Sequence, residues 1–106
     1  MKLDEFYERL SSLDDAIYQI IATGQFKNSL KLSYKQGKNL ELLLDIVYKL
    51  SKGLELDEKY RSHKLTGYGE DFWECHIKPD WLLIWKVYTN ELALVLVDTG
   101  THSYLF

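Results

Sequence analysis

Three histidines are the side chains of this sequence best suited to acid–base chemistry. His63, His76 and His102 are far apart in the chain, and an imidazole can accept or donate a proton near neutral pH. His76 stands in an alternating run that reads Trp73-Glu74-Cys75-His76-Ile77-Lys78-Pro79-Asp80-Trp81. Such alternation predicts a strand with one core face and with Glu74 and His76 on the other. Two interpretations remain open: a polar site on a rigid support, or a half-buried strand with a solvated face.

Metal and thiol chemistry find little support in the spacing of these residues. The chain has no His-x-x-x-His and no Cys-x-x-Cys pattern, and Cys75 is adjacent to His76 and therefore points to the opposite strand face. We expect no metal and no cofactor, and we interpret Cys75 as a small core residue rather than a nucleophile. No glycine pattern supports the sharp turn of a serine hydrolase nucleophile.

The composition predicts one small globular domain. The chain has 106 residues, of which 46% are hydrophobic, so it can bury a core without a disulfide. The single cysteine indicates a reducing compartment, and neither a signal-peptide pattern nor a bilayer-spanning run is present, so we expect a cytoplasmic protein with no membrane contact. The formal charge of -3 argues weakly against nucleic acid, although a local basic face could still bind it.

Hydrophobic periodicity and turn residues divide the chain into helices and strands. The predicted elements are an acidic helix over 3–14, a strand over 16–22, a helical hairpin over 25–36 and 39–52, a connection over 54–71, strands over 72–78, 81–88 and 92–98, and a final helical turn after Gly100. The polar connection over 54–71 contains His63, and long ordered connections often carry function.

This order of elements predicts an α+β fold. We expect the first strand to join the three-stranded meander at an edge, which gives a four-stranded antiparallel sheet with the helical hairpin on one face. Residues 1–16 form an N-terminal helical extension, and residues 17–106 form the main domain.

Four lysines follow helical spacing on the first helix of the hairpin. Lys27, Lys31, Lys35 and Lys38 occupy positions i, i+4, i+8 and i+11, so one face of an uninterrupted helix would carry four ammonium groups. This pattern is typical of a solvated helix face, and equally of a stripe that follows a phosphate backbone.

Several short motifs together resemble those of the YafQ family. Its members are RelE-superfamily mRNA interferase toxins of bacterial type II toxin–antitoxin systems. The motifs are Ser62-His63-Lys64-Leu65, Glu74-Cys75-His76-Ile77-Lys78-Pro79-Asp80-Trp81, Thr99-Gly100-Thr101-His102 and Leu105-Phe106. The resemblance covers residues 17–106 and leaves the N-terminal helix outside it. It implies a RelE-like fold with the helical hairpin packed on the sheet.

The resemblance also implies a metal-independent endoribonuclease that cuts mRNA in the ribosomal A site. Its site residues would be His63, His76, Asp80, His102 and Phe106, with Trp81 nearby. Phe106 and Trp81 would stack a splayed base, or Trp81 would pack in the core instead. The implied partners are a cognate antitoxin, ribosome-bound mRNA, and operator DNA reached only through the antitoxin.

Cleavage of RNA through its 2′-OH requires one proton acceptor and one proton donor. We expect His76 or Asp80 to help deprotonate the 2′-OH and His102 to protonate the leaving 5′-oxygen. His63 would stabilise the phosphate charge or share in the proton transfer.

The chain departs from the family pattern at two positions. Members usually have arginine where this chain has Trp73 and Asp98, and both changes remove a guanidinium that could hold phosphate. The alternative is therefore a catalytically weak or inactive binding module of the same fold, which acts through antitoxin and operator complexes. An antitoxin segment would bind the sheet or a helix face. The acidic residues 1–16 would add to that contact or cover the lysine face.

Overall fold

The structure is a computed structural model, and it describes residues 1–67 and 71–106. Residues 68–70 of the predicted connection lie outside the described residues. The elements in chain order are α1 (Leu3–Ser11), β1 (Gln19–Ala22), α2 (Gly24–Lys35), α3 (Leu40–Ser51), a 3-10 turn η1 (Glu58–Tyr60), β2 (His63–Lys64), β3 (Phe72–Lys78), β4 (Trp81–Tyr88), β5 (Ala93–Gly100) and α4 (His102–Leu105). None of the helices in the described ranges is long and apolar enough to cross a bilayer.

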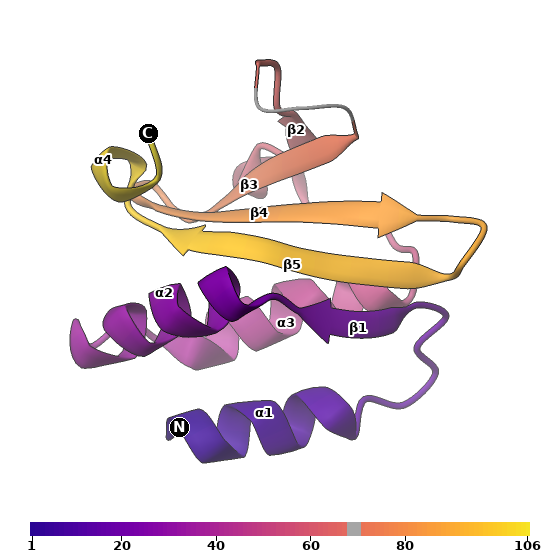
Figure 1. Ribbon diagram of the computed structural model, residues 1–106, viewed down its shortest axis with the longest axis horizontal. Helices are drawn as coiled ribbons and strands as arrows, with labels where there is room; N and C mark the ends of the chain where they lie inside the picture. The colour runs from indigo at the N-terminus through magenta and orange to yellow at the C-terminus, as the bar shows by residue number, and fades with distance from the viewer. Residues whose placement is uncertain (68–70) are drawn as a thin grey trace.

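Helices α2 and α3 cover one face of a five-stranded mixed sheet, whose edge strand β1 lies level with these helices in Figure 1. The strand order is β1-β5-β4-β3-β2, in which β1 runs parallel to β5 and the other neighbours are antiparallel. The α+β prediction and the edge position of β1 are confirmed. The predicted four antiparallel strands were wrong, because β2 adds a strand and β1 runs parallel.

The physical reason for this error is that an edge strand can form a ladder in either direction with similar hydrogen bonding. The direction of β1 depends on where the helical hairpin returns the chain, which periodicity does not encode. β2 has only two residues, His63 and Lys64, and both are exposed, so no hydrophobic alternation marked it within the polar connection.

The apolar positions predicted by periodicity meet in one core between the sheet and the helices. Cys75 and Ile77 of β3 point into it, while Glu74 and His76 alternate to the other sheet face, as predicted. The Asn39 side chain accepts a hydrogen bond from the backbone N–H of Glu41 and thereby caps the N-terminus of α3. Fully buried core side chains include Phe26, Leu30, Leu43, Ile46, Val47, Leu83, Leu94 and Leu96.

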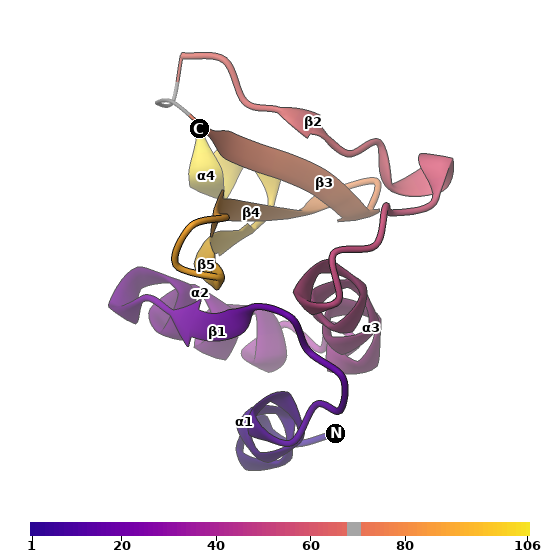
Figure 2. The same cartoon turned by 90° about the vertical axis from the view of Figure 1, so that its right-hand side faces the viewer.

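Helix α1 lies beneath the layer of α2 and α3, on the side away from the sheet (Figures 1 and 2). Phe6 is fully buried and Leu10 is 9% exposed, and burial of one such phenylalanine is worth about 2–3 kcal/mol. Arg9 Nη1 also pairs with Glu41 Oε1 of α3 at 2.8 Å, but this exposed pair contributes at most about 1 kcal/mol. Apolar packing therefore holds α1. No acidic side chain of this helix forms a described ion pair with a lysine of α2.

Cys75 is fully buried on the core side of β3. Burial, reinforced by the negative charge of Glu74, raises the pKa of the Cys75 thiol to about 12. We expect iodoacetamide at pH 8 to leave the folded protein unlabelled and to label it after unfolding in guanidinium, as measured by mass spectrometry. Equal labelling of the folded and unfolded protein would show that Cys75 is accessible.

Candidate active site

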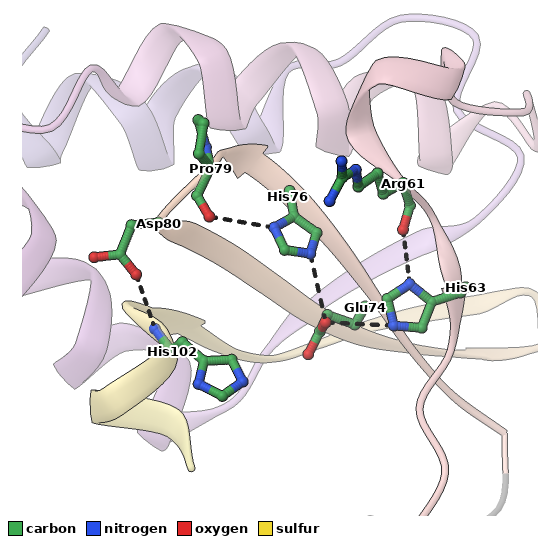
Figure 3. A network of polar contacts seen from close by, with 7 residues as sticks. All are labelled: Arg61, His63, Glu74, His76, Pro79, Asp80 and His102. Atoms are coloured by element: carbon green, nitrogen blue, oxygen red, sulfur yellow. Dashed lines mark hydrogen bonds and ion pairs between the residues drawn. The ribbon is translucent and has the colours of Figure 1, made fainter.

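Glu74 forms the centre of a polar cluster on the sheet face that the helices leave open. The pairing of β2 with β3 places His63 directly opposite Glu74, and His76 follows two residues later on the same face of β3. Glu74 Oε1 lies 3.4 Å from Nε2 of His63 and 4.0 Å from Nε2 of His76 (Figure 3). Because Glu74 is only 6% exposed, one largely desolvated carboxylate faces the Nε2 atoms of two imidazoles.

The second nitrogen of each imidazole faces a backbone carbonyl. His63 Nδ1 lies 2.7 Å from the oxygen of Arg61, and His76 Nδ1 lies 3.4 Å from the oxygen of Pro79. Since a carbonyl oxygen only accepts, we assign the hydrogen to Nδ1 in both rings. Each Nε2 is then the nitrogen that can exchange a proton with Glu74 or with a substrate.

The turn between β3 and β4 connects this cluster to the C-terminal helix. Pro79 contacts His76, and the next residue, Asp80, accepts a hydrogen bond at Oδ1 from the backbone N–H of His102 at 3.4 Å. In Figure 3 the His102 ring extends from α4 in the direction of Glu74. The ring also packs against Phe106, with centroids 5.1 Å apart. The five residues of the predicted catalytic set therefore belong to one connected region.

Tyr104 anchors α4 in this position. Its hydroxyl lies 3.0 Å from the hydroxyl of Ser29 on α2, and its ring lies against Gly100. A Cβ at Gly100 would lie 2.6 Å from Tyr104 Cδ2, and the φ of +155° also disfavours other residues. Glycine at this position therefore lets α4 lie close to the end of β5.

Trp81 packs in the core, which is one of the two roles predicted for it. It is 2% exposed, and its Nε1–H donates to Thr99 Oγ1 at 3.0 Å. Thr99 in turn donates to the carbonyl of Leu82 at 2.7 Å. The stacking role is therefore corrected: Trp81 packs in the core, where a base cannot reach it, while Phe106 is 51% exposed.

The four lysines do not form one continuous stripe. Helix α2 ends at Lys35, and Gly37 follows with a φ of 78°, so Lys38 leaves the helical face that carries Lys27 and Lys31. Lys38 instead lines a small cleft beside Asp80, and its Nζ lies 5.8 Å from the centroid of the Trp81 ring. No contact in the described part of the chain joins the other three lysines to the site.

The two departures from the family pattern have different consequences. Trp73 lies on the core side of β3 and stacks on Trp85, with ring centroids 6.4 Å apart. A guanidinium at position 73 would therefore not point directly at the site. The effect of tryptophan at position 73 on cleavage stays a prediction. Asp98 lies on the same face as Glu74, with Ile84 between them, after a register shift between β4 and β5.

Asp98 is 3% exposed and is held by two hydrogen bonds. Gln25 donates from its side chain to Oδ2, and the backbone N–H of Thr99 donates to Oδ1 at 2.9 Å. This face of the sheet thus holds a second buried carboxylate at the position where the family has arginine.

Glu74 lies at the centre of the cluster but is not among the site residues predicted from the sequence. The alternation of the predicted strand already indicated that Glu74 lies near His76, because positions 74 and 76 share one face of that strand. Its distance to His63 depends on β2, which the sequence did not predict. Within residues 1–67 and 71–106, no group of three or more His, Cys, Asp or Glu side chains could hold a metal ion, and the absence of a metal stays a prediction.

Residues 18–106 match the family model described as "Bacterial toxin of type II toxin-antitoxin system, YafQ". The chain belongs to the YafQ toxin family. The "mRNA interferase toxin YafQ" of Escherichia coli K12 is 35% identical to this YafQ-family chain over 85 residues, which are 79% of this chain and 90% of the relative. The predicted family and its enzyme class, endoribonuclease, are therefore confirmed.

Solved structures of YafQ-family and related toxins share this fold. A metal-bound toxin from Helicobacter pylori superposes with a TM-score of 0.81 at 40% identity, covering 84% of this chain and 99% of that one. The toxin–antitoxin complex of DinJ and YafQ from E. coli gives a TM-score of 0.78 at 32% identity, covering 85% and 98%. Both comparisons leave a minor part of this YafQ-family chain unmatched.

Proposed function

We propose that this chain cleaves mRNA in the ribosomal A site, in the cytoplasm, as the toxin of a toxin–antitoxin pair. The observation that carries this proposal is the contact of one buried carboxylate, Glu74, with two imidazoles on an open sheet face beside His102. Relatives named mRNA interferase toxin support the substrate, and the structure of a relative bound to DinJ supports an antitoxin partner. Operator DNA would be reached only through that antitoxin.

The reaction begins with removal of the proton of the RNA 2′-OH. We assign this step to His76, whose Nε2 can accept the proton while the Pro79 carbonyl accepts Nδ1–H and Glu74 stabilises the imidazolium that forms. Asp80 was the other candidate base, but its Oδ1 already accepts the backbone N–H of His102. Asp80 is therefore a positioning residue that holds α4, and His76 is the base.

The 2′-oxygen then attacks the adjacent phosphorus, and the bond from phosphorus to the 5′-oxygen breaks. His102 protonates the departing 5′-oxygen, and His63 stabilises the charge on the phosphate oxygens. The exposed ring of Phe106 offers a surface on which a base can stack. The products are a 2′,3′-cyclic phosphate and a 5′-hydroxyl, and this route needs no metal ion.

This chemistry gives a direct test in a bacterial translation extract that contains the purified toxin. We expect mRNA to be cut only when ribosomes translate it, and the upstream fragments to end in a cyclic phosphate. Co-addition of the antitoxin encoded next to the toxin should stop the cleavage. Translation without new RNA ends, together with tight antitoxin binding, would contradict this function.

Tight antitoxin binding without mRNA cleavage would instead identify the alternative, a YafQ-fold binding module without catalysis. Asp98 is the specific observation in favour of it, because a buried carboxylate on the site face repels phosphate. The complete set of histidines favours the enzyme. Lys27, Lys31 and Lys35 remain proposed as secondary contacts to RNA, and Lys38 as a contact near Asp80.

A further inference from the structure

A cleft opens beside the candidate active site, between the end of β3 and the segment that contains η1. Its volume is about 420 Å³. The lining residues are Leu42, Lys59, Tyr60, Arg61, His76, Ile77, Lys78 and Pro79. His76 belongs to both the cleft and the catalytic cluster, so the cleft begins next to the proposed position of the cleaved phosphate.

The charge of this cleft is opposite to that of the whole chain. The chain carries a net charge of -3, yet Lys59, Arg61 and Lys78 line the cleft, and none of its described lining residues is acidic. Within the described ranges, no ion pair neutralises any of these three cations. Unneutralised cations in a concave site attract an anion strongly.

Arg61 links the cleft to the catalytic cluster through its backbone. It closes η1 in the left-handed region, with a φ of 50° and a ψ of 47°, and its carbonyl oxygen lies 2.7 Å from His63 Nδ1. Figure 3 shows its guanidinium extending toward His76. A guanidinium has the planar, forked geometry that binds two phosphate oxygens at once.

We propose that this cleft binds the RNA phosphate next to the one that is cleaved. Arg61 and Lys78 are the direct contacts, and Lys59 adds positive charge. The inference rests on the proposed function, because an RNA strand lying across His76 must continue past it with its next phosphate. The cleft thereby supplies cationic contacts to a site whose centre holds the carboxylate of Glu74. Contacts to phosphate do not read bases, so this binding is independent of sequence.

The test measures binding of a 2′-O-methyl hexauridylate, which keeps every phosphate but has no attacking 2′-OH. The variants are Arg61→Gln and Lys78→Gln, and the control is Lys2→Gln, which removes the same charge outside the cleft. We expect each cleft variant to weaken binding by about three- to tenfold at physiological salt. We also expect the slope of log affinity against log salt to fall by about 0.7 for each lost phosphate contact. Thermal unfolding should be unchanged, because both side chains are exposed.

The outcomes separate this inference from the proposed function. Cleft variants that match Lys2→Gln in affinity and salt slope would overturn the inference, even if the parent protein cleaves mRNA. Weakened binding by the cleft variants would support it, even if the parent cleaves nothing. A parent protein that does not bind the RNA would overturn it. Variants that lose affinity only for a hexaglutamate peptide would show a protein-binding site instead.

Discussion

Replacement of His102 with alanine is expected to slow mRNA cleavage by about 10²–10⁴-fold, the usual contribution of a positioned general acid. The imidazole is the proton donor proposed for the 5′-oxygen, and the exposed residues beside it on α4 offer no other titratable side chain near neutral pH. The rate is measured in the translation extract at saturating ribosome concentration. Ser103→Ala provides the matched control, since it changes an exposed neighbour on the same helix.

A modified substrate separates a loss of acid catalysis from a displaced helix. If the bridging 5′-oxygen of one mRNA linkage is replaced with sulfur, the leaving thiolate needs little protonation. The His102→Ala variant should then cut that linkage at nearly the parent rate. A variant that cuts ordinary mRNA as fast as the parent, or that remains slow on the sulfur substrate, would show that His102 is not the acid.

The replacement of Glu74 with glutamine should slow cleavage by about 10²-fold, although the side chain keeps its size and both imidazoles remain. When His76 takes a proton at Nε2, the carboxylate that faces this nitrogen stabilises the new positive charge, which a neutral amide does much less. The amide also turns an N–H group toward one of the rings. His76 would then lose the partner that stabilises its protonated form.

A double-mutant cycle tests whether Glu74 acts through His76. If it does, Glu74→Gln combined with His76→Ala should be about as slow as His76→Ala alone, because no imidazolium is left at position 76 for the carboxylate to stabilise. The pH dependence of the single Glu74→Gln variant should also shift, which a merely structural role would not produce. Fully additive effects with an unchanged pH profile would assign Glu74 a role separate from that base.

Much of the fold could be predicted from local patterns. The bounds of β3 and β4 agree with the strands predicted over 72–78 and 81–88. The amide of Asn39 caps α3 as its position before an apolar stripe predicts. These features depend on residues close in sequence, so a single sequence contains the information that specifies them.

Features that depend on distant residues were predicted poorly. The end of α2 at Lys35 removed Lys38 from the predicted stripe, and the burial of Trp81 depends on Thr99, eighteen residues away. The missed strand β2 exists because His63 and Lys64 pair with β3. In each case the residues nearby in the sequence do not indicate which distant segment will form the contact.

The residue order alone was enough to identify the α+β class, the helical hairpin and the YafQ family, and to propose its three histidines as site residues. The folded chain was needed to show that Glu74 joins His63 to His76, that Trp81 is internal, and that Arg61 and Lys78 face one cleft. The reason is physical. Residue type and spacing set which groups can exchange protons, whereas strand direction, burial and unneutralised charge arise only when distant segments pack together.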